Sequence, residues 1–191
     1  MANELQGKKI AILLAPVGSE QAEFTEPKKA VEDEGATVEV IGLQTGDAQT
    51  MNSDVNPGET FTVEKTFSEV SADDYDGLII PGGTVGADNL RGDEDAVGFI
   101  HAFFAQAKPV GVICHGPWTL VEADVVNGRT LTSFPTLQTD IRNAGGNWVD
   151  EEVVVDQGLV TSRNPDDLPA FCSKIVEEFA EGKNEDQRRS A

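Results

Sequence analysis

Short apolar runs alternate with amphipathic segments along most of the chain. The runs Lys8–Ala15 and Gly77–Ile80 show no polar alternation, which is typical of parallel strands buried on both faces. A helix is expected over about residues 20–34, with Gly35 at its end. Further strands are expected at Thr37–Leu43, Thr60–Lys65 and Pro109–Ile113, further helices at Glu94–Gln106, Pro117–Val126 and Pro165–Glu181, and a hairpin at Val153–Asp156 and Leu159–Ser162. Strands that alternate with helices predict an α/β fold with a mostly parallel sheet covered on both faces.

Length and hydropathy predict one domain over residues 1–181 of the 191, followed by a polar tail at 182–191 that is expected to be frayed. No apolar run is long enough to cross a bilayer, and the first residues lack the apolar stretch of a signal peptide. A cytoplasmic protein without a membrane partner is therefore expected.

Charge is strongly unbalanced, with 34 acidic against 14 basic residues and a formal net charge of −20. This surplus repels nucleic acid and anionic membranes, because both require a basic footprint. The acidic residues are spread along the chain, which argues against a metal site and favours a halophilic source, where salt screens the repulsion. An acidic protein from an ordinary environment is the alternative.

Metal and disulfide chemistry find little support in the sequence. Two cysteines and two histidines occur, in no zinc-finger spacing. Two cysteines in a cytoplasmic setting predict no disulfide framework, and Cys172 is interpreted as a small packing residue. No metal and no organic cofactor are expected.

Cys114 is the strongest candidate for chemistry. It follows an apolar strand directly and precedes His115, Gly116 and Pro117, a sequence that begins a helix at once. This order resembles a nucleophile elbow, in which a strained turn lifts the nucleophile above the sheet. The start of the helix favours a thiolate through its free N–H groups and dipole. A buried, inert cysteine is the alternative, and the combined pattern favours a nucleophile.

His115 is the imidazole that could assist Cys114, although adjacency alone does not show that its ring reaches the thiol. Its backbone N–H is a candidate oxyanion donor, since the residue after an elbow nucleophile has that role. The other histidine, His101, lies in an expected helix and is interpreted as a packing or surface residue.

Two further segments end at the same side of the expected sheet. Gly82 and Gly83 follow a strand but do not fit a dinucleotide-binding motif, and no helix is expected to begin promptly after them. They form either a turn that offers a second oxyanion N–H or a plain tight turn. Glu20 and Glu23 share a helix face. Buried there, a carboxyl would be protonated and could donate to a thiolate. In so acidic a protein an ordinary solvated acidic face is the first interpretation, and the sequence chemistry alone leaves the choice open.

Six ordered motifs resemble the PfpI family, the branch of the ThiJ/PfpI superfamily that holds intracellular cysteine peptidases and general stress proteins. They include Ile-Cys-His-Gly-Pro-x-x-Leu at 113–120 and Glu-x-x-Glu-Phe-Thr-x-Pro at 20–27. The others lie at 80–83, 90–93, 143–156 and 160–171. The similarity spans about residues 8–180.

This resemblance implies a flavodoxin-like three-layer sandwich, as in class I glutamine amidotransferase domains, with a Cys–His–Glu site. Cys114 would be the nucleophile, His115 its neighbour, and Glu23 the acid that hydrogen-bonds the sulfur, with Glu20 lining the pocket. In peptidase members an acid from a neighbouring subunit joins the histidine, and Asp88 falls at that place. A homo-oligomer, either dimer or hexamer, is therefore implied.

Two departures narrow the implied activity. Phe134 stands where the family carries a polar tyrosine or histidine, which weighs against peptidase activity of the reference kind. No histidine follows His115, which argues against glutaminase chemistry. The expected function is a cysteine-dependent stress protein acting on reactive carbonyls or their adducts, as a deglycase or glyoxalase-like hydrolase. The alternatives are an intracellular peptidase cleaving peptides and a redox sensor or chaperone-like protein in which Cys114 is oxidised.

Overall fold

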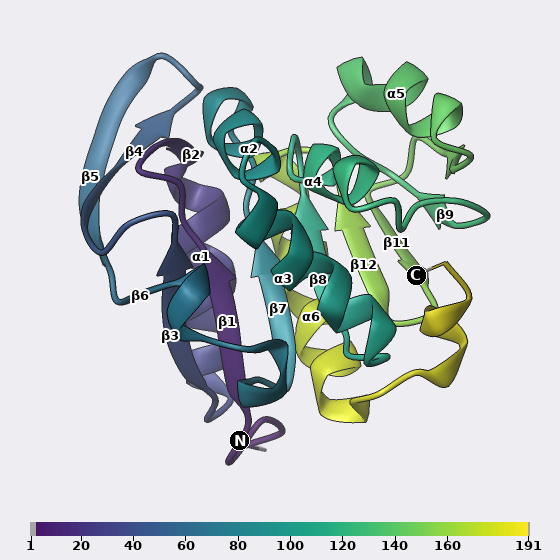
Figure 1. Ribbon diagram of the computed structural model, residues 1–191, viewed down its shortest axis with the longest axis horizontal. Helices are drawn as coiled ribbons and strands as arrows, with labels where there is room; N and C mark the ends of the chain where they lie inside the picture. Colours follow the sequence, from purple (N-terminus) through teal and green to yellow (C-terminus); the bar gives the residue numbers. More distant parts are fainter. Residues whose placement is uncertain (1–2, 191) are drawn as a thin grey trace.

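The structure is a computed structural model that describes residues 3–190. Its main sheet has seven strands in the order β11-β12-β8-β7-β1-β3-β6 (Figure 1). All neighbouring strands in it are parallel except β11 and β12, which form the predicted hairpin. The strands are β1 (Lys9–Leu13), β3 (Thr37–Gly42), β6 (Lys65–Thr66), β7 (Gly77–Ile80), β8 (Val110–Ile113), β11 (Val153–Asp156) and β12 (Leu159–Ser162).

Helices cover both faces of this sheet. α1 (Gln21–Asp33) and α6 (Leu168–Glu181) pack on one face, and α2 (Thr84–Arg91), α3 (Glu94–Ala105) and α4 (Pro117–Glu122) lie on the other (Figure 1). Successive residues of a strand point to opposite faces. Ile10 and Ile12 of β1 accordingly belong to the core under α1 and α6, and Ala11 and Leu13 to the core under α3. The predicted flavodoxin-like sandwich is confirmed.

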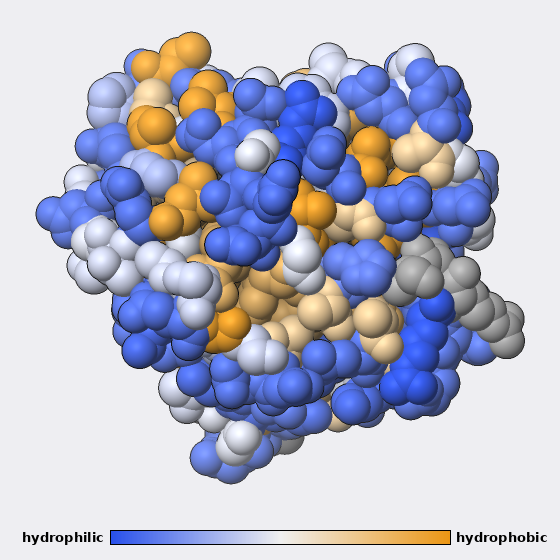
Figure 2. All heavy atoms as spheres, viewed as in Figure 1, coloured by the Kyte–Doolittle hydropathy of each residue, from blue (hydrophilic) through white to orange (hydrophobic). Residues whose placement is uncertain are grey.

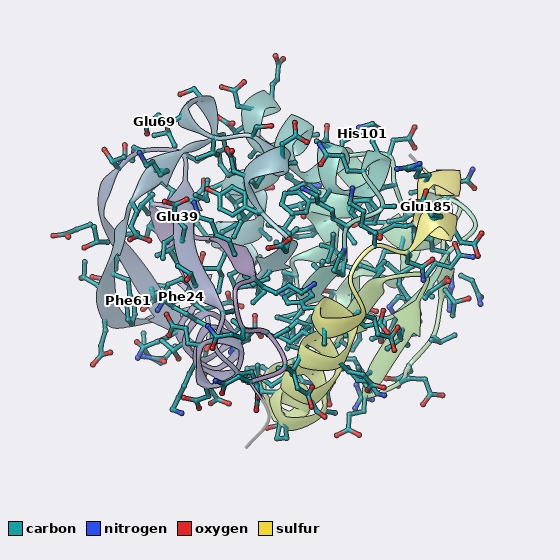
Figure 3. The ribbon with its side chains drawn as sticks, turned by 90° about the horizontal axis from the view of Figure 1, so that it is seen from below. Phe24, Glu39, Phe61, Glu69, His101 and Glu185 are labelled. Atoms are coloured by element: carbon teal, nitrogen blue, oxygen red, sulfur yellow. The ribbon has the colours of Figure 1, made fainter. Side chains whose placement is uncertain are left out.

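A second, three-stranded sheet stands at one side of the molecule. It consists of β2 (Val17–Glu20), β4 (Gly46–Asn52) and β5 (Asn56–Val63), in the order β2-β4-β5. The sequence predicted only one strand in this region, and it missed β4 because that segment is largely polar. Phe24 of α1 and Phe61 of β5 face one another with ring centroids 5.0 Å apart, and this contact fixes the hairpin against the body (Figure 3).

Smaller elements complete the chain at the far end of the sheet and in the connections. They are β9 (Thr130–Leu131), β10 (Asn147–Trp148), α5 (Gln138–Asn143) and five short 3-10 helices, η1 (Phe67–Glu69), η2 (Ala72–Asp74), η3 (Pro135–Leu137), η4 (Pro165–Asp167) and η5 (Glu185–Ser190). The helix expected to run to Val126 ends at Glu122, because the chain turns through Asp124 in the left-handed region (φ 55°).

The segment after Gly83 corrects the sequence interpretation, which expected no helix there. α2 begins at Thr84, directly after Gly83. Glycine has no side chain to cap a helix, and the cap comes instead from a distant residue: the backbone N–H of Thr84 donates to Asp54 Oδ1 at 2.7 Å. Because the capping group lies thirty residues earlier in the chain, the local sequence carries no sign of this helix.

The segment predicted to be a frayed tail contains a short 3-10 helix over residues 185–190. η5 packs against the body, and Gln187 within it is fully buried. The buried Arg129 guanidinium donates to the backbone oxygens of Gln187 at 2.6 Å, Val125 at 3.1 Å and Asp156 at 3.1 Å. Arg129 therefore ties the end of the chain to the hairpin of the main sheet.

Hydrophilic residues cover most of the face seen in Figure 2 without gathering in one area, in line with the spread of charge along the sequence. Within the described range 3–190, no helix has the length and apolar character that crossing a membrane requires.

Candidate active site

Cys114 lies at the carboxyl end of β8, in the left-handed conformation (φ 62°). This conformation costs a residue with a side chain about 1–3 kcal/mol, and the surrounding bonds hold it in place. Its N–H donates to Ser162 O at 3.0 Å and its carbonyl accepts from Phe134 N–H at 2.8 Å. Gly116 N–H then closes the turn onto Ile113 O at 2.9 Å, and α4 begins at Pro117. The local geometry is that of a nucleophile elbow.

Gly82 allows β7 to approach this turn closely. A Cβ at Gly82 would lie 2.6 Å from Cys114 Cβ and 2.5 Å from Glu23 Oε2. Both distances are shorter than atoms of a real side chain tolerate. The glycine is therefore required for Cys114 and Glu23 to lie so near the end of β7.

Glu23 projects from the first turn of α1 and is fully buried. Its Oε2 accepts the N–H of Gly82 at 2.8 Å. Its Oε1 is buried without a hydrogen-bond partner among the described residues, and the Cys114 side chain lines the same cavity. Burial raises the pKa of Glu23 to about 8, against the opposing effect of the Gly82 N–H. The carboxyl is accordingly neutral at pH 7, and because Oε2 accepts the Gly82 N–H, Oε1 is the oxygen left to carry the proton.

Burial holds both Cys114 and Glu23 toward their neutral forms, in contrast to the thiolate that the start of the helix alone would favour. Burial raises the pKa of Cys114 well above its ordinary value, the ionised Glu23 raises it further, and the N–H groups of Gly83 and His115 lower it. Protonation of Glu23 removes the repelling charge and turns the carboxyl into a donor toward sulfur. A thiolate is therefore compatible only with a neutral Glu23, and the two groups titrate as a pair.

His115 does reach the thiol. Its Nδ1 lies 3.2 Å from Cys114 Sγ, and its Nε2 lies 3.3 Å from Thr84 Oγ1. The ring stacks on Phe134 with centroids 4.6 Å apart and meets Trp118 edge-on at 5.4 Å. Burial lowers the pKa of His115, with Asp54 acting in the opposite direction. A neutral imidazole thus stands beside the sulfur.

Two backbone N–H groups lower the pKa of the Cys114 thiol, those of Gly83 and His115. The N–H of Gly82, which the sequence also offered as an oxyanion donor, is occupied by Glu23 at 2.8 Å. The geometry therefore leaves Gly83 and His115 as the pair that could hold an oxyanion next to the sulfur.

The remaining predicted acids lie in different surroundings. Glu20 borders the site, and its two oxygens accept the N–H groups of Ser53 at 2.9 Å and Asp54 at 3.2 Å, so it holds the turn between β4 and β5. Asp88 lies exposed on α2 and pairs with Arg91 at 2.9 Å. Among the described residues, no hydrogen bond joins Asp88 to His115.

His101 and Cys172, which the sequence analysis assigned no role in catalysis, lie away from Cys114. His101 is exposed on α3 (Figure 3). Cys172 is half-buried in α6, and burial raises the pKa of its thiol to about 12. Two polar residues of the site were missed by the sequence reasoning, Asp54 and Thr84. The turn-rich composition of residues 52–58 could indicate a hairpin, but nothing in it indicates that the hairpin reaches Cys114.

A small cavity of about 140 Å³ opens onto the sulfur. It is lined by Glu20, Glu23, Ser53, Asp54, Gly83, Cys114, Phe134 and Pro165. Pockets that enclose drug-sized ligands measure about 300–1,000 Å³, so this site is sized for a much smaller molecule. Within residues 3–190, no three histidine, cysteine or carboxylate side chains gather in a way that could hold a metal ion.

Fold and site together define a flavodoxin-like α/β protein with a cysteine elbow at the carboxyl end of a central parallel strand. The DJ-1/PfpI family matches residues 8–178, and the chain belongs to this family. The resemblance drawn from the motifs is thereby confirmed.

Two curated relatives from Bacillus subtilis carry functional names. The chain is 43% identical over 164 residues to a Bacillus subtilis protein named "Putative cysteine protease YraA", covering 86% of this chain and 94% of that protein. It is also 43% identical over 166 residues to "General stress protein 18" of Bacillus subtilis, with 86% and 94% covered. The crystal structure of Drosophila melanogaster DJ-1beta superposes with a TM-score of 0.80 at 27% identity, covering 99% of this chain and 95% of that one.

Proposed function

We propose that this protein is a cysteine-dependent enzyme that hydrolyses small reactive carbonyl compounds or their adducts, with Cys114 as the nucleophile. The observation that carries the proposal is a cavity of about 140 Å³ in which the Cys114 thiol meets the buried Glu23. A 2-oxoaldehyde or a glyoxal-modified amine end fits a site of this size, whereas an extended peptide reaches it only by one side chain.

The proposed reaction begins when His115 Nδ1, 3.2 Å from the sulfur, takes the thiol proton and Cys114 sulfur attacks an aldehyde carbon. The C=O π electrons move to oxygen, which takes up the proton of Glu23 after facing the N–H groups of Gly83 and His115, and a hemithioacetal results. In a 2-oxoaldehyde, the Glu23 carboxylate left by this step then moves the C1 proton to C2 while the C1 hydroxyl proton passes to the C2 oxygen, which yields a thioester of a 2-hydroxy acid. Water cleaves the thioester and restores the thiol, and the proton held by His115 returns to Glu23, so that the net change is 2-oxoaldehyde plus water to 2-hydroxy acid.

One observation favours a peptidase as the second candidate. The neutral imidazole of His115 lies 3.2 Å from the thiol, as in a thiol–imidazole pair that forms acyl-enzymes. Asp88 acting on His115 across a subunit interface, and the dimer or hexamer that this requires, stay predictions. The replacement of a polar residue by Phe134, which stacks on the imidazole, weighs toward the carbonyl substrate.

The test compares wild-type protein with Cys114→Ser and with Cys172→Ser, the matched control at the other cysteine. Purified proteins receive methylglyoxal, a glyoxal-modified lysine derivative and casein, in low and high salt. We expect acid release from the carbonyl substrates by the wild type and Cys172→Ser, and a loss of at least about 100-fold in Cys114→Ser.

Other outcomes discriminate the alternatives. Casein cleavage that depends on Cys114, without carbonyl turnover, would establish the peptidase instead. If neither substrate is turned over and peroxide adds two oxygens to Cys114 by intact mass, the redox-sensor interpretation replaces both enzymes. Carbonyl turnover that persists in Cys114→Ser refutes the proposed nucleophile.

A further inference from the structure

We propose that Asp54 and Thr84 form a hydrogen-bond relay that holds the His115 imidazole with its lone pair toward Cys114, so that this chain orients its own histidine. The inference rests on the proposed function, in which Cys114 is the nucleophile and His115 its base. Asp54 and Thr84 are positioning residues here, because they act on the reacting sulfur only through His115.

The distances define a continuous chain of contacts. Thr84 Oγ1 lies 2.9 Å from Asp54 Oδ2 and 3.3 Å from His115 Nε2, and Nδ1 of the same ring lies 3.2 Å from Cys114 Sγ. Thr84 is thus the bridge between a carboxylate and the imidazole. All four side chains belong to one chain, and Asp88 takes no part in these contacts.

Donor and acceptor chemistry sets the direction of the relay. An ionised carboxylate only accepts, so the Thr84 hydroxyl donates to Asp54. Because the single hydroxyl proton of Thr84 is donated to Asp54, Thr84 Oγ1 can only accept a hydrogen bond from His115 Nε2–H. A neutral imidazole carries one proton, so Nδ1 presents its lone pair to the sulfur. This is the tautomer in which His115 can take the thiol proton.

Contacts that do not involve His115 hold Asp54 in place. Ser53 and Asp54 have left-handed backbone conformations (φ 55° and 63°), and the Glu20 carboxylate accepts both of their N–H groups. Asp54 Oδ1 also accepts the Thr84 N–H at 2.7 Å, which joins the β4–β5 turn to the start of α2. The sheet of β2, β4 and β5 stands beside α2 in Figure 1. Glu20 therefore serves the site as the anchor of this turn.

Among the side chains of residues 3–190, Asp54 is the one charged group that acts on the imidazole of His115. Phe134 and Trp118 contact its ring and are uncharged, and Asp54 is the charged group that affects it. Arg91 lies over the Trp118 ring, 4.6 Å from its centroid, and Glu23 lies against Cys114. The Asp54–Thr84 pair is thus the structural feature that selects the tautomer.

Asp54→Asn tests the relay because asparagine has the shape of aspartate but reverses the direction of the hydrogen bonds between residue 54, Thr84 and His115. The Thr84 N–H is a fixed donor, so the amide oxygen of the new side chain must face it. The amide NH₂ then faces Thr84 Oγ1 and donates to it. Thr84 must turn its own proton to Nε2, and His115 becomes the Nδ1–H tautomer, a donor toward sulfur that cannot act as base.

The experiment reads the tautomer by NMR of ¹⁵N-histidine-labelled protein. His101→Gln removes the only other histidine, which is exposed and outside the site, so that every signal belongs to His115. We expect the Nε2–H form in His101→Gln and the Nδ1–H form when Asp54→Asn is added. Thr84→Val should give a mixture of both tautomers, and Thr84→Ser should restore the Nε2–H form.

Carbonyl turnover supplies the second measurement. We expect kcat/KM to fall about 100-fold in Asp54→Asn, the magnitude of a lost general base, and to recover in Thr84→Ser relative to Thr84→Val. A wild type without turnover refutes the proposed function, while the NMR spectra still decide the relay. An Nδ1–H tautomer in His101→Gln, or an Nε2–H tautomer that survives Asp54→Asn, overturns the relay.

Discussion

Replacing Glu23 by glutamine is expected to change how the stability of the fold depends on pH. Burial raises the pKa of Glu23 from its ordinary value of 4.5 to about 8. The native state therefore keeps a proton that the unfolded chain releases, and wild-type stability falls as the pH rises between these two values. Each pKa unit corresponds to about 1.4 kcal/mol, so the loss between pH 5 and pH 8 is about 3–4 kcal/mol.

The glutamine side chain of the Glu23→Gln variant is neutral in both states, and its amide can accept from Gly82 N–H and donate to sulfur. The free energy of unfolding of this variant, minus that of the wild type, should accordingly rise by about 3–4 kcal/mol from pH 5 to pH 8. Urea unfolding at constant salt measures this difference. The pair of measurements is repeated with Cys114→Ser in both proteins, which removes the coupled thiol.

Glu26→Gln is the matched control, because Glu26 lies on the same helix but is exposed. Its difference from the wild type should change by less than about 1 kcal/mol over the same pH range. If the free energy of unfolding of Glu23→Gln minus that of the wild type changes as little with pH as it does for Glu26→Gln, both with Cys114 and with Ser at position 114, the conclusion that the native state holds a protonated Glu23 is refuted.

Two more substitutions test the packing around the site and the end of the chain. Gly82→Ala places a Cβ within 2.6 Å of Cys114 Cβ, so we expect a loss of about 1–3 kcal/mol in urea unfolding together with reduced carbonyl turnover; unchanged values would show that the turn can yield. Arg129→Met removes the donor that lies 2.6 Å from Gln187 O, so we expect faster amide exchange over residues 185–190 and a stability loss on the order of 3 kcal/mol; unchanged exchange would contradict the anchoring role.

The main sheet could be predicted from the sequence because its signals are local. Apolar runs such as Gly77–Ile80 cannot be solvated, and each is followed by an amphipathic segment, so a parallel sheet between helices is the arrangement that buries both. The second sheet lacks such a signal. Its strand β4 is polar, and its position depends on contacts such as Phe24 with Phe61, whose residues are 37 positions apart.

The packing of residues 185–190 could not be predicted from the sequence for a similar reason. Its polar composition is typical of a frayed end, and composition cannot show that a buried guanidinium binds its backbone. Arg129 is 58 residues away from Gln187 in sequence, yet it donates to that carbonyl and makes a polar segment part of the fold.

In the candidate site too, the parts set by neighbouring residues could be predicted and the parts set by distant segments could not. Cys114, His115 and Gly116 are consecutive, so a strained turn before a helix could be inferred from residue types alone. What surrounds them depends on three other segments meeting at one point. Glu23 could be either a solvated or a buried acid until its Oε2 is seen to accept Gly82 N–H.

Asp54 shows why residue types alone do not assign an acid to a histidine. Asp88 resembles the family's partner acid in sequence, yet within the chain its carboxylate pairs with Arg91. Asp54 has no such resemblance, but Glu20 fixes its backbone and Thr84 carries its effect to His115. The direction of each hydrogen bond in that series depends on the one before it, beginning with a backbone N–H that can only donate. A role of this kind exists only in the folded geometry, and it is for this reason that an amide substitution, equal in shape, is expected to reverse it.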